Sequence, residues 1–362
     1  LAVSKRGAKR RLVSLHGGIS AHISDPDEFA SSLLYATGSP GHLAQLEVYA
    51  HIEGFALSAT GLRRNRKPIP VADETELYSL LGMSYIEPEL REGAGETRLA
   101  RNDHLPQLVT VGDIRGILHS HTTESDGSET LETMANAARE RGYQYYGVAD
   151  HSKLAVYANG LSEERALRQQ NQIEALNRRY EAQGSGFRVF KGTECDILAD
   201  GELDYSDDLL SKFDYVVASV HSRFKLSGED QTKRIVRAVS NPWVTILGHP
   251  TGRLLLAREG YNVQVSAVLE ACAKHGVAVE INANSHRLDL DWRWHETALE
   301  LGCDFSIDTD EHSIGELDNI RWGVMIARKG GVPAERIQVC RTQERLAAAF
   351  EERKARAVSM QR

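Results

Sequence analysis

Nine side chains of metal-binding type are distributed over nearly two hundred residues of this sequence. They are six histidines, two aspartates and one glutamate: His119, His121, Asp126, His151, Glu194, His221, His249, Asp310 and His312. Imidazole and carboxylate donors suit Zn, Mn or Fe, and soft thiolate ligands are absent from the set. Nine donors exceed the four that one tetrahedral ion takes. The set therefore predicts a centre of two or three divalent ions, Zn or Mn before Fe, in which Glu194 and Asp126 could act as bridges.

The chemistry expected of such a centre is phosphoester hydrolysis. Multi-metal sites activate a water and hold the oxygens of a phosphoryl group during an in-line displacement. The expected nucleophile is a metal-bound water, and no side chain is assigned as a base. One of these histidines alone would more often be a structural residue. Nine suitable residues, almost all where an apolar run stops, favour a metal centre instead.

Four further polar residues stand beside the predicted ligands. Asp150 precedes His151 and could either orient a ligand or cap a helix. Arg223, Arg253 and Arg287 each follow a ligand-bearing or strand-ending segment and could bind substrate phosphates. A surface or ion-pair role is the alternative for each arginine.

The elements that must position these residues alternate along the chain. Strand-like runs occupy residues 117–121, 145–150, 187–194, 215–221, 244–249, 277–282 and 303–308. Helical patterns lie between some of them, at 129–141, 162–183, 264–275 and 292–301. Seven strands with helices between them predict a (β/α) barrel, with an open doubly wound sheet as the competing architecture. The barrel is favoured because a ring of strand ends explains ligands after nearly every strand.

The remaining segments differ in character from the barrel, which we place at residues 111–342. Residues 1–62 predict a small α/β unit that begins with a basic run. Residues 63–110 are rich in proline and predict a connector with little regular structure, apart from a short helix after the capping pair Asp73 and Glu76. Residues 343–362 predict a charged C-terminal helix or tail.

Composition limits the classes of protein that this chain can be. A net charge of -8 argues against a wholly basic nucleic-acid coat but leaves room for a local DNA-binding patch. The four cysteines form no CxxC pair, which favours reduced thiols in a cytoplasmic protein. No apolar run predicts a membrane segment or a signal peptide. The chain opens with Leu1 and is immediately basic, so we expect a fragment of something longer.

The ligand-bearing strings resemble one known family. GILHSHTTESDG, GVADHS, GTECDI, VASVHS, GHPTGRLLL and SIDTDEH are similar to motifs of the PHP (polymerase and histidinol phosphatase) family. They resemble in particular the PHP domain at the C-terminus of bacterial family X DNA polymerases, over about residues 111–340. This resemblance implies a distorted seven-stranded (β/α) barrel with a trinuclear metal site, and all nine ligand positions carry metal-competent residues.

The first hundred residues extend the resemblance to the polymerase part of that family. LLYATGS (residues 33–39) is similar to the thumb motif, and residues 74–92 and 95–100 resemble the connector. The fold expected overall is thus an α/β palm and thumb remnant followed by the barrel. N–H groups at Gly38 and Ser39 could bind a DNA backbone phosphate, and the basic N-terminus could hold DNA.

Two departures bear on polymerase activity. Of the three catalytic aspartates in the family's palm, two would lie before Leu1, and Ser20 stands at the position of the third. Ala36 replaces the aromatic residue that follows Tyr35 in the thumb motif. Because nucleotide transfer needs carboxylates to hold its metal ions, we do not expect this chain to polymerise DNA by itself.

Three functions are weighed on this basis. The leading hypothesis is a phosphoesterase that acts on gapped, nicked or single-stranded DNA 3′ ends in repair, and the resemblance implies 3′–5′ exonuclease activity with 3′-phosphatase or abasic-site activity as additions. The second is a small-molecule phosphatase of the histidinol-phosphatase type, which would need no thumb. The third is a non-catalytic DNA-binding scaffold, which would not need nine intact ligands.

Overall fold

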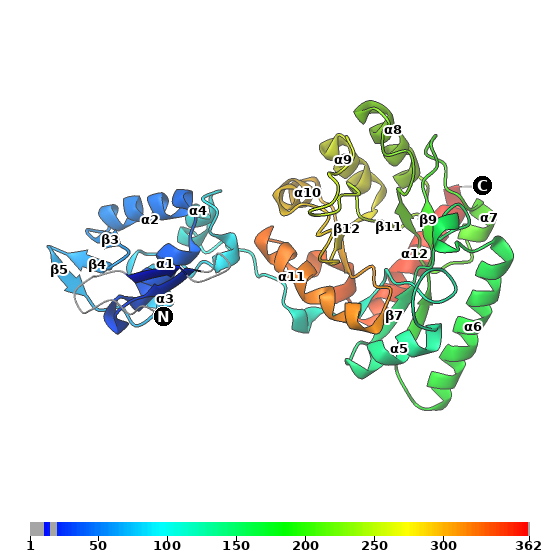
Figure 1. The fold of residues 1–362 in the computed structure, drawn as a ribbon, viewed down its shortest axis with the longest axis horizontal. Helices are drawn as coiled ribbons and strands as arrows, with labels where there is room; N and C mark the ends of the chain where they lie inside the picture. The colour runs from blue at the N-terminus through cyan, green and yellow to red at the C-terminus, as the bar shows by residue number, and fades with distance from the viewer. Residues whose placement is uncertain (1–10, 15–19, 361–362) are drawn as a thin grey trace. The chain divides into compact units, whose positions relative to one another are not determined.

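The computed structural model describes residues 11–14 and 20–360, and the chain divides into two compact units (Figure 1). The units are Leu1–Pro106 and Gln107–Arg362. Each unit has its own hydrophobic core among the described residues. Most of the predicted basic run, from Lys5 to Arg10, lies outside the described residues.

The first unit combines short antiparallel strands with short helices. Its strands are β1 (Arg11–Ser14), β2 (Ser20–Ile23), β3 (Ala56–Ser58), β4 (Gly61–Arg64) and β5 (Lys67–Ile69). β1 pairs with β2, and β3, β4 and β5 form a second antiparallel sheet in that order. Its helices are η1 (Pro26–Glu28), α1 (Phe29–Thr37), α2 (Pro40–Ile52), α3 (Glu74–Leu80), η2 (Pro88–Leu90) and α4 (Glu96–Arg101).

The expectation of a connector with little regular structure is wrong. Residues on both sides of position 62 share one core, to which Leu34, Leu46, Leu77, Tyr78 and Ala100 contribute buried side chains. Burial in this core stabilises helices too short to persist alone. The many prolines fit because they stand at permitted places, such as an edge strand or the first turn of a helix.

The helix starts in this unit follow local sequence signals. Asp73 caps α3 by accepting from the N–H of Glu76 at 2.9 Å, and the Glu76 carboxylate accepts in turn from the N–H of Ala72 at 2.6 Å. The predicted capping pair is therefore present, with its return bond shifted by one residue. Ser39 caps α2 by accepting from the N–H of His42 at 3.1 Å, and Pro40 occupies the first turn.

The second unit is built on a ring of parallel strands. One sheet contains β6 (Gly116–Ile117), β7 (Tyr145–Val148) and β8 (Arg188–Lys191); the other contains β9 (Glu194–Asp196), β10 (Val217–Ser219), β11 (Ile246–Leu247), β12 (Ala278–Asn282) and β13 (Phe305–Asp308). Single bridges from Ser120 to Glu311 and from His151 to Glu194 join the sheets on both sides. Every predicted strand-like run contributes to this ring, and the predicted distorted barrel is confirmed.

The break between β8 and β9 shows one source of the distortion. A Cβ atom on Gly192 would lie 2.2 Å from the ring of Tyr215, so only glycine lets the backbone pass this side chain. Tyr215 is itself buried, and its hydroxyl donates to the carbonyls of Leu118 and Val148. Tyr215 therefore packs against the backbone where the chain passes from β8 to β9.

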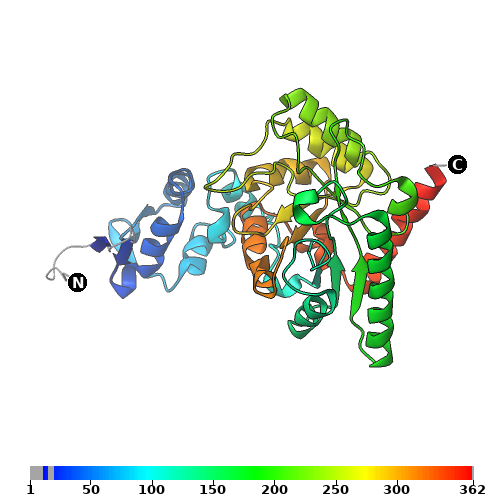
Figure 2. The same cartoon turned by 45° about the vertical axis from the view of Figure 1, so that its right-hand side comes forward.

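Helices surround the ring of strands (Figures 1 and 2). They are α5 (Leu131–Glu140), α6 (Glu163–Ala182), α7 (Asp207–Leu210), α8 (Gly228–Val239), α9 (Val265–His275), α10 (His295–Leu301), α11 (Ile320–Lys329) and α12 (Gln343–Met360). Six 3-10 turns accompany them: η3 (Val111–Asp113), η4 (Val156–Ala158), η5 (Trp292–Trp294), η6 (Ile314–Asn319), η7 (Ala334–Arg336) and η8 (Gln338–Cys340). In the described part of the chain, no helix combines the length and apolar character needed to cross a membrane.

Three of these helices, α7, α8 and α11, were not expected from the sequence. The buried residues of α8 include Gln231, Thr232 and Arg234 beside Ile235 and Ala238, so its inner face is not apolar. Its signals are nevertheless present in the sequence, because Ser227 caps it and apolar residues recur at Ile235, Ala238 and Val239. The four predicted helices of the barrel are present, and Gly276 and Gly302 end α9 and α10 in the left-handed conformation.

Candidate metal centre

The structure brings the nine predicted ligands together at the C-terminal ends of the barrel strands. The donors form three groups, and within each group the ligand atoms lie within 4.8 Å of one another. The groups are His121, Asp126, His151 and His312; His119, His121 and Asp310; and His151, Glu194 and His221. The ninth residue, His249, joins through Nε2, which lies 2.9 Å from Oε1 of Glu194. His121 and His151 each belong to two groups, so the groups form one continuous cluster.

Glu194 lies at the middle of the cluster. Its Oε1 is 3.3 Å from Nε2 of His119 and 3.2 Å from Nε2 of His221, and its Oε2 is 2.8 Å from Nδ1 of His151. Burial alone would raise the pKa of this carboxyl group, but the imidazoles of His221, His119 and His151 hold the pKa well below its usual range. A carboxylate with a different set of imidazoles on each oxygen has the geometry of a bridging ligand.

Asp126, the other predicted bridge, occupies the rim. Its side chain is 31 % exposed, and its Oδ1 lies 3.3 Å from Nε2 of His312 and 3.7 Å from Nε2 of His151. The group that contains Asp126 is thus open to solvent, whereas His119, His121 and Asp310 are buried.

Several buried donor atoms of the cluster have no hydrogen-bond partner, which is what a site for bound cations requires. Five buried ligand atoms make no hydrogen bond: Nε2 of His119, Nδ1 of His121, Nδ1 of His151, Oε2 of Glu194 and Nδ1 of His249. Burying a polar atom without a partner is costly, and native proteins rarely do so without a reason. Divalent ions would satisfy such atoms together, and the imidazole and carboxylate donors suit Zn, Mn or Fe.

Three buried carboxylates position the ligands from behind. Oε1 of Glu280 lies 2.6 Å from Nδ1 of His119, and its Oε2 accepts from the N–H of His249 at 2.5 Å. Oδ1 of Asp196 lies 3.0 Å from Nδ1 of His221. Such partners fix the ring orientation and leave the other nitrogen to face a metal.

The third buried carboxylate, Asp150, holds a ligand-bearing loop. It accepts from the N–H and the hydroxyl of Thr122 at 2.7 and 2.6 Å, and also from Ser125 and Gln169. These bonds fix the segment that leads to Asp126. Of the two roles predicted for Asp150, the structure favours ligand positioning over helix capping.

Comparisons with known proteins agree with this architecture. Residues 32–92 match the family model of the DNA polymerase beta thumb, and residues 118–284 match that of the PHP domain. The chain is 39% identical over 308 residues to the DNA polymerase/3'-5' exonuclease PolX of Bacillus subtilis (strain 168), an alignment that covers 84% of this chain and 53% of that protein. The chain carries the thumb and the PHP domain of a bacterial family X DNA polymerase. It spans about half the length of this relative.

Two further proteins are similar to part of this chain. A probable phosphatase of Thermoanaerobacter sp. (strain X514) is 26% identical over 226 residues, which cover 59% of this chain and 85% of that protein. The solved structure of histidinol phosphate phosphatase from Lactococcus lactis, complexed with zinc, L-histidinol and phosphate, superimposes with a TM-score of 0.45 at 16% identity, over 60% of this chain and 94% of that one.

The three predicted phosphate-binding arginines of the PHP domain lie in different surroundings. Nε of Arg287 is 3.1 Å from Oδ2 of Asp310, at the edge of the metal cluster. Arg253 instead donates to Asp291 at 2.7 Å and to the carbonyl of Arg287 at 2.9 Å, so the structural role fits it. Arg223 is exposed two residues after His221 with a left-handed backbone (φ 57°), and phosphate binding by it stays a prediction.

The backbone N–H groups predicted to bind phosphate in the thumb, those of Gly38 and Ser39, already have partners. The N–H of Gly38 donates to the carbonyl of Leu34 at 2.8 Å, and the N–H of Ser39 donates to the carbonyl of Arg91 at 3.0 Å. Because both amides are already used in the turn between α1 and α2, neither is free to bind a DNA backbone phosphate. Ser20 lies in β2, but its side chain is outside what the structure describes.

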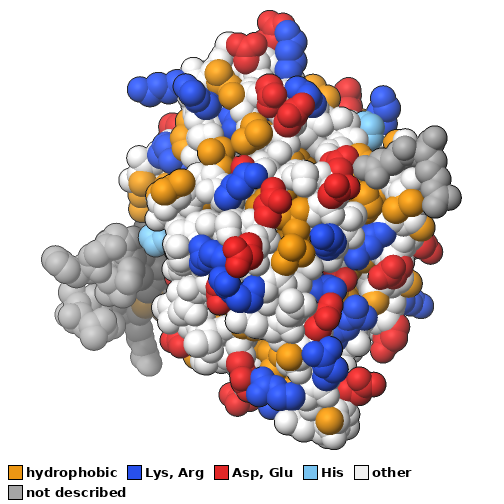
Figure 3. All heavy atoms as spheres, turned by 90° about the vertical axis from the view of Figure 1, so that its right-hand side faces the viewer, with side chains coloured by type: hydrophobic (Ala, Val, Ile, Leu, Met, Phe, Trp, Pro, Cys, Tyr) orange, Lys and Arg blue, Asp and Glu red, His pale blue; other side chains and the backbone are white. Residues whose placement is uncertain are grey.

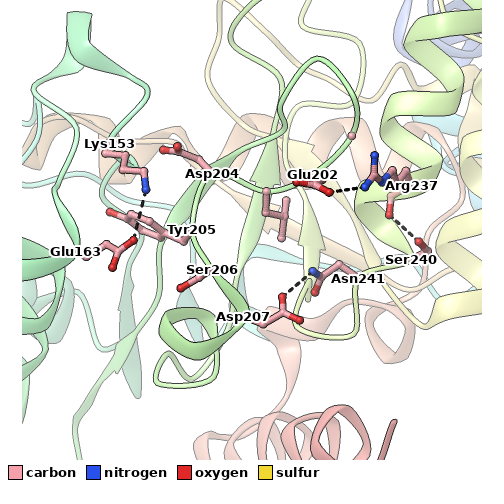
Figure 4. Close-up of a pocket in the computed structure, with 12 residues that line it drawn as sticks. Lys153, Glu163, Glu202, Asp204, Tyr205, Ser206, Asp207, Arg237, Ser240 and Asn241 are labelled. Carbon is pink, nitrogen blue, oxygen red and sulfur yellow. Dashed lines mark hydrogen bonds and ion pairs between the residues drawn. The ribbon is translucent and has the colours of Figure 1, made fainter. Parts of the chain in front are cut away.

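A separate pocket of about 610 Å³ lies on the PHP domain (Figure 4). None of the nine predicted ligands lines it. Its basic groups are paired within the pocket, Lys153 with Glu163 at 3.4 Å and Arg237 with Glu202 at 2.5 Å. The pocket therefore offers no unpaired cation to an anionic substrate.

Proposed function

We propose that this chain is a metal-dependent phosphoesterase that acts on DNA 3′ ends, as a 3′–5′ exonuclease or end-processing enzyme in DNA repair. The observation that carries the proposal is the cluster of nine donors around Glu194, with Arg287 at its edge, in a chain that also contains a thumb. A phosphatase of small molecules would need the cluster but not the thumb.

Each group of residues has a distinct task in this proposal. Divalent ions held by the nine donors would polarise a phosphoryl oxygen and activate the attacking water. Arg287 presents a planar guanidinium suited to a second phosphoryl oxygen. Burial lowers the pKa of Arg287, but Asp310 and Glu194 raise it above its ordinary value, so the group keeps its charge. No described side chain is assigned as the base.

The proposed DNA partner is a gapped, nicked or single-stranded 3′ end. The surface of the PHP domain in Figure 3 mixes basic and acidic side chains. This mixture fits recognition at a local site better than a basic coat. We place the activity in the cytoplasm, because four free cysteines and a DNA substrate are compatible with that compartment.

One experiment separates the proposal from its alternatives. The protein is loaded with Mn²⁺ or Zn²⁺ and given 5′-labelled single-stranded and gapped DNA, in parallel with histidinol phosphate. A ladder of shortened DNA supports the proposal. Phosphate release from histidinol phosphate alone would support a small-molecule phosphatase, and no reaction in either arm would favour the scaffold. His121→Ala and His249→Ala should remove whichever activity is seen.

Primer extension is the matching test of the polymerase prediction. With Ser20 at the aspartate position, the 362-residue chain should add no nucleotide to a primed template under conditions in which a complete polymerase does. Robust extension would show that other carboxylates hold the required metal ions.

A further inference from the structure

The loop that follows His151 presents a tyrosine ring beside the metal cluster. Tyr157 lies in η4 and is 70% exposed. Its ring centroid is 6.1 Å from that of His151 and 6.3 Å from that of His221, with interplanar angles of 60° and 67°. Those two histidines form one donor group with Glu194. A large aromatic surface thus stands next to the predicted chemistry without being needed for the core.

The loop that carries Tyr157 is closed at its base. Ser152 and Leu161 pair as a parallel bridge, and the N–H of Gly160 donates to the carbonyl of Ala155 at 3.0 Å. A Cβ atom on Gly160 would lie 2.0 Å from the carbonyl oxygen of Ser152, so glycine permits this close approach.

The same loop is tied to its surroundings on both sides. The N–H of Leu154 donates to Asp204 at 2.7 Å, and the amide of Asn159 donates to the carbonyl of Glu124 at 3.1 Å. Ala155 and Ala158 point inward and are buried, whereas Val156 and Tyr157 are exposed. The loop therefore holds the exposed ring in a defined place, which lowers the entropy lost when a ligand packs against it.

We propose that Tyr157 is a stacking platform for the unpaired 3′-terminal base of a single-stranded DNA end, an inference that rests on the proposed phosphoesterase function. A base and its phosphate are joined through one sugar, so a base beside the scissile phosphate is within reach of a ring that contacts two ligand histidines. Stacking suits a nuclease because every base offers an aromatic face, and recognition is tolerant of sequence.

The charge pattern agrees with a nucleotide in this place. Arg287 at Asp310 offers a contact for the phosphate, and Tyr157 offers one for the base. A tyrosine side chain is uncharged at neutral pH, because its ordinary pKa is about 10, so the ring stacks without repelling DNA. A base inside a duplex is already stacked and paired, so the platform favours frayed or single-stranded ends.

The test compares two single-stranded oligonucleotides that differ only at the 3′ end. One ends in a normal thymidine and the other in a tetrahydrofuran abasic residue, and kcat/KM for removal of the terminal residue is measured for each. Stacking of one base predicts a preference of about tenfold for thymidine in the wild type. Tyr157→Ala should bring this ratio close to one, mainly through KM, whereas Tyr157→Phe should keep it.

Val156→Ala is the matched control, because it shortens an exposed side chain on the same turn and leaves the ring in place. It should keep the tenfold ratio. A wild type without preference, or a Tyr157→Ala variant that retains the full preference, would overturn the stacking proposal even if both oligonucleotides are hydrolysed.

A binding measurement separates this proposal from the function on which it rests. An oligonucleotide with 2-aminopurine at its 3′ end is mixed with the metal-loaded protein, and fluorescence quenching is recorded. Quenching by the wild type and by Tyr157→Phe, but not by Tyr157→Ala, supports stacking even if no DNA is cleaved. Equal quenching by all three variants, or none, contradicts it.

Discussion

Buried histidines meet carboxylates in both units of this protein, but they are satisfied differently. In the thumb, Nδ1 of His42 lies 2.6 Å from Glu96 and Nε2 lies 2.8 Å from the hydroxyl of Tyr78, so both ring nitrogens are used. In the PHP domain, His119 has Glu280 on one nitrogen, while the other nitrogen makes no hydrogen bond. Both nitrogens of His42 are thus used within the fold, whereas His119 keeps one oriented and one unsatisfied nitrogen, as a metal ligand needs.

The same contrast holds for the carboxylates. Glu96 accepts from the N–H of Gly93 at 2.8 Å as well as from His42, which ties a loop to α2. Among the described residues, the ion-pair contacts of Glu194 are with imidazoles, and its Oε2 makes no hydrogen bond. The thumb network thus holds a fold together, whereas the cluster around Glu194 is built to hold cations.

The largest expected effect comes from the central carboxylate. Glu194→Gln removes the negative charge shared by the ligand histidines, so phosphoesterase activity should fall more than about 100-fold, beyond the loss usual for residues behind the ligands. Metal content, measured by elemental analysis after dialysis, should fall with it. Retention of full metal content and activity would show that the cluster is not the metal centre.

The thumb histidine should affect stability instead. His42→Ala leaves Glu96 buried without its partner, and the free energy of unfolding of the thumb should fall by about 3–5 kcal/mol in a denaturant titration. Metal content should not change. His51→Ala, an exposed position on the same helix α2, is the control and should have little effect. Loss of metal in His42→Ala would contradict the separation of roles.

A smaller change is expected from a carboxylate behind the ligands. Glu280→Gln keeps the shape of the side chain but weakens its hold on His119, so metal affinity should fall about 10–100-fold in a competition titration with a chelator. Glu270→Gln, an exposed carboxylate on α9, should leave affinity unchanged. Equal affinities for the Glu280 and Glu270 variants would argue against this positioning role.

The smallest effect is a pH dependence confined to the thumb. Burial raises the pKa of Glu96, but His42 and the N–H of Gly93 lower it below 4.5 overall. A carboxyl whose folded-state pKa is lowered contributes stability above its unfolded pKa, and this contribution is lost as pH falls through the folded-state pKa. Between pH 7 and pH 3, the free energy of unfolding should therefore fall less in Glu96→Gln than in the wild type. If the free energy of unfolding fell equally with pH in both proteins, Glu96 would contribute nothing to the pH dependence of stability.

The parts predicted from the sequence are those that leave a local signal. Almost all of the nine residues stand where a strand-like run ends, so the barrel and the members of the candidate cluster could be inferred before their distances were known. Glu280 and Asp196 are not among the predicted residues, because their role depends on which strands lie side by side. A weak signal exists for Asp196, which alternates with Glu194 and so projects on the same face of β9.

Other predictions failed where long-range packing decides the outcome. The residues after position 62 are rich in proline but fold because they share a core with α1 and α2. The amides of Gly38 and Ser39 look available in the sequence, yet the carbonyl of Arg91, far along the chain, occupies the N–H of Ser39. Local composition gives no information about partners that lie so far apart in the sequence.

Release of 3′-terminal nucleotides from 5′-labelled single-stranded DNA tests the central claim most directly. The account predicts a ladder with the Mn²⁺- or Zn²⁺-loaded wild type, and none with the chelator-treated protein or with Glu194→Gln. A ladder of equal strength from Glu194→Gln, or no ladder from a wild type shown to contain its metal ions, would contradict it.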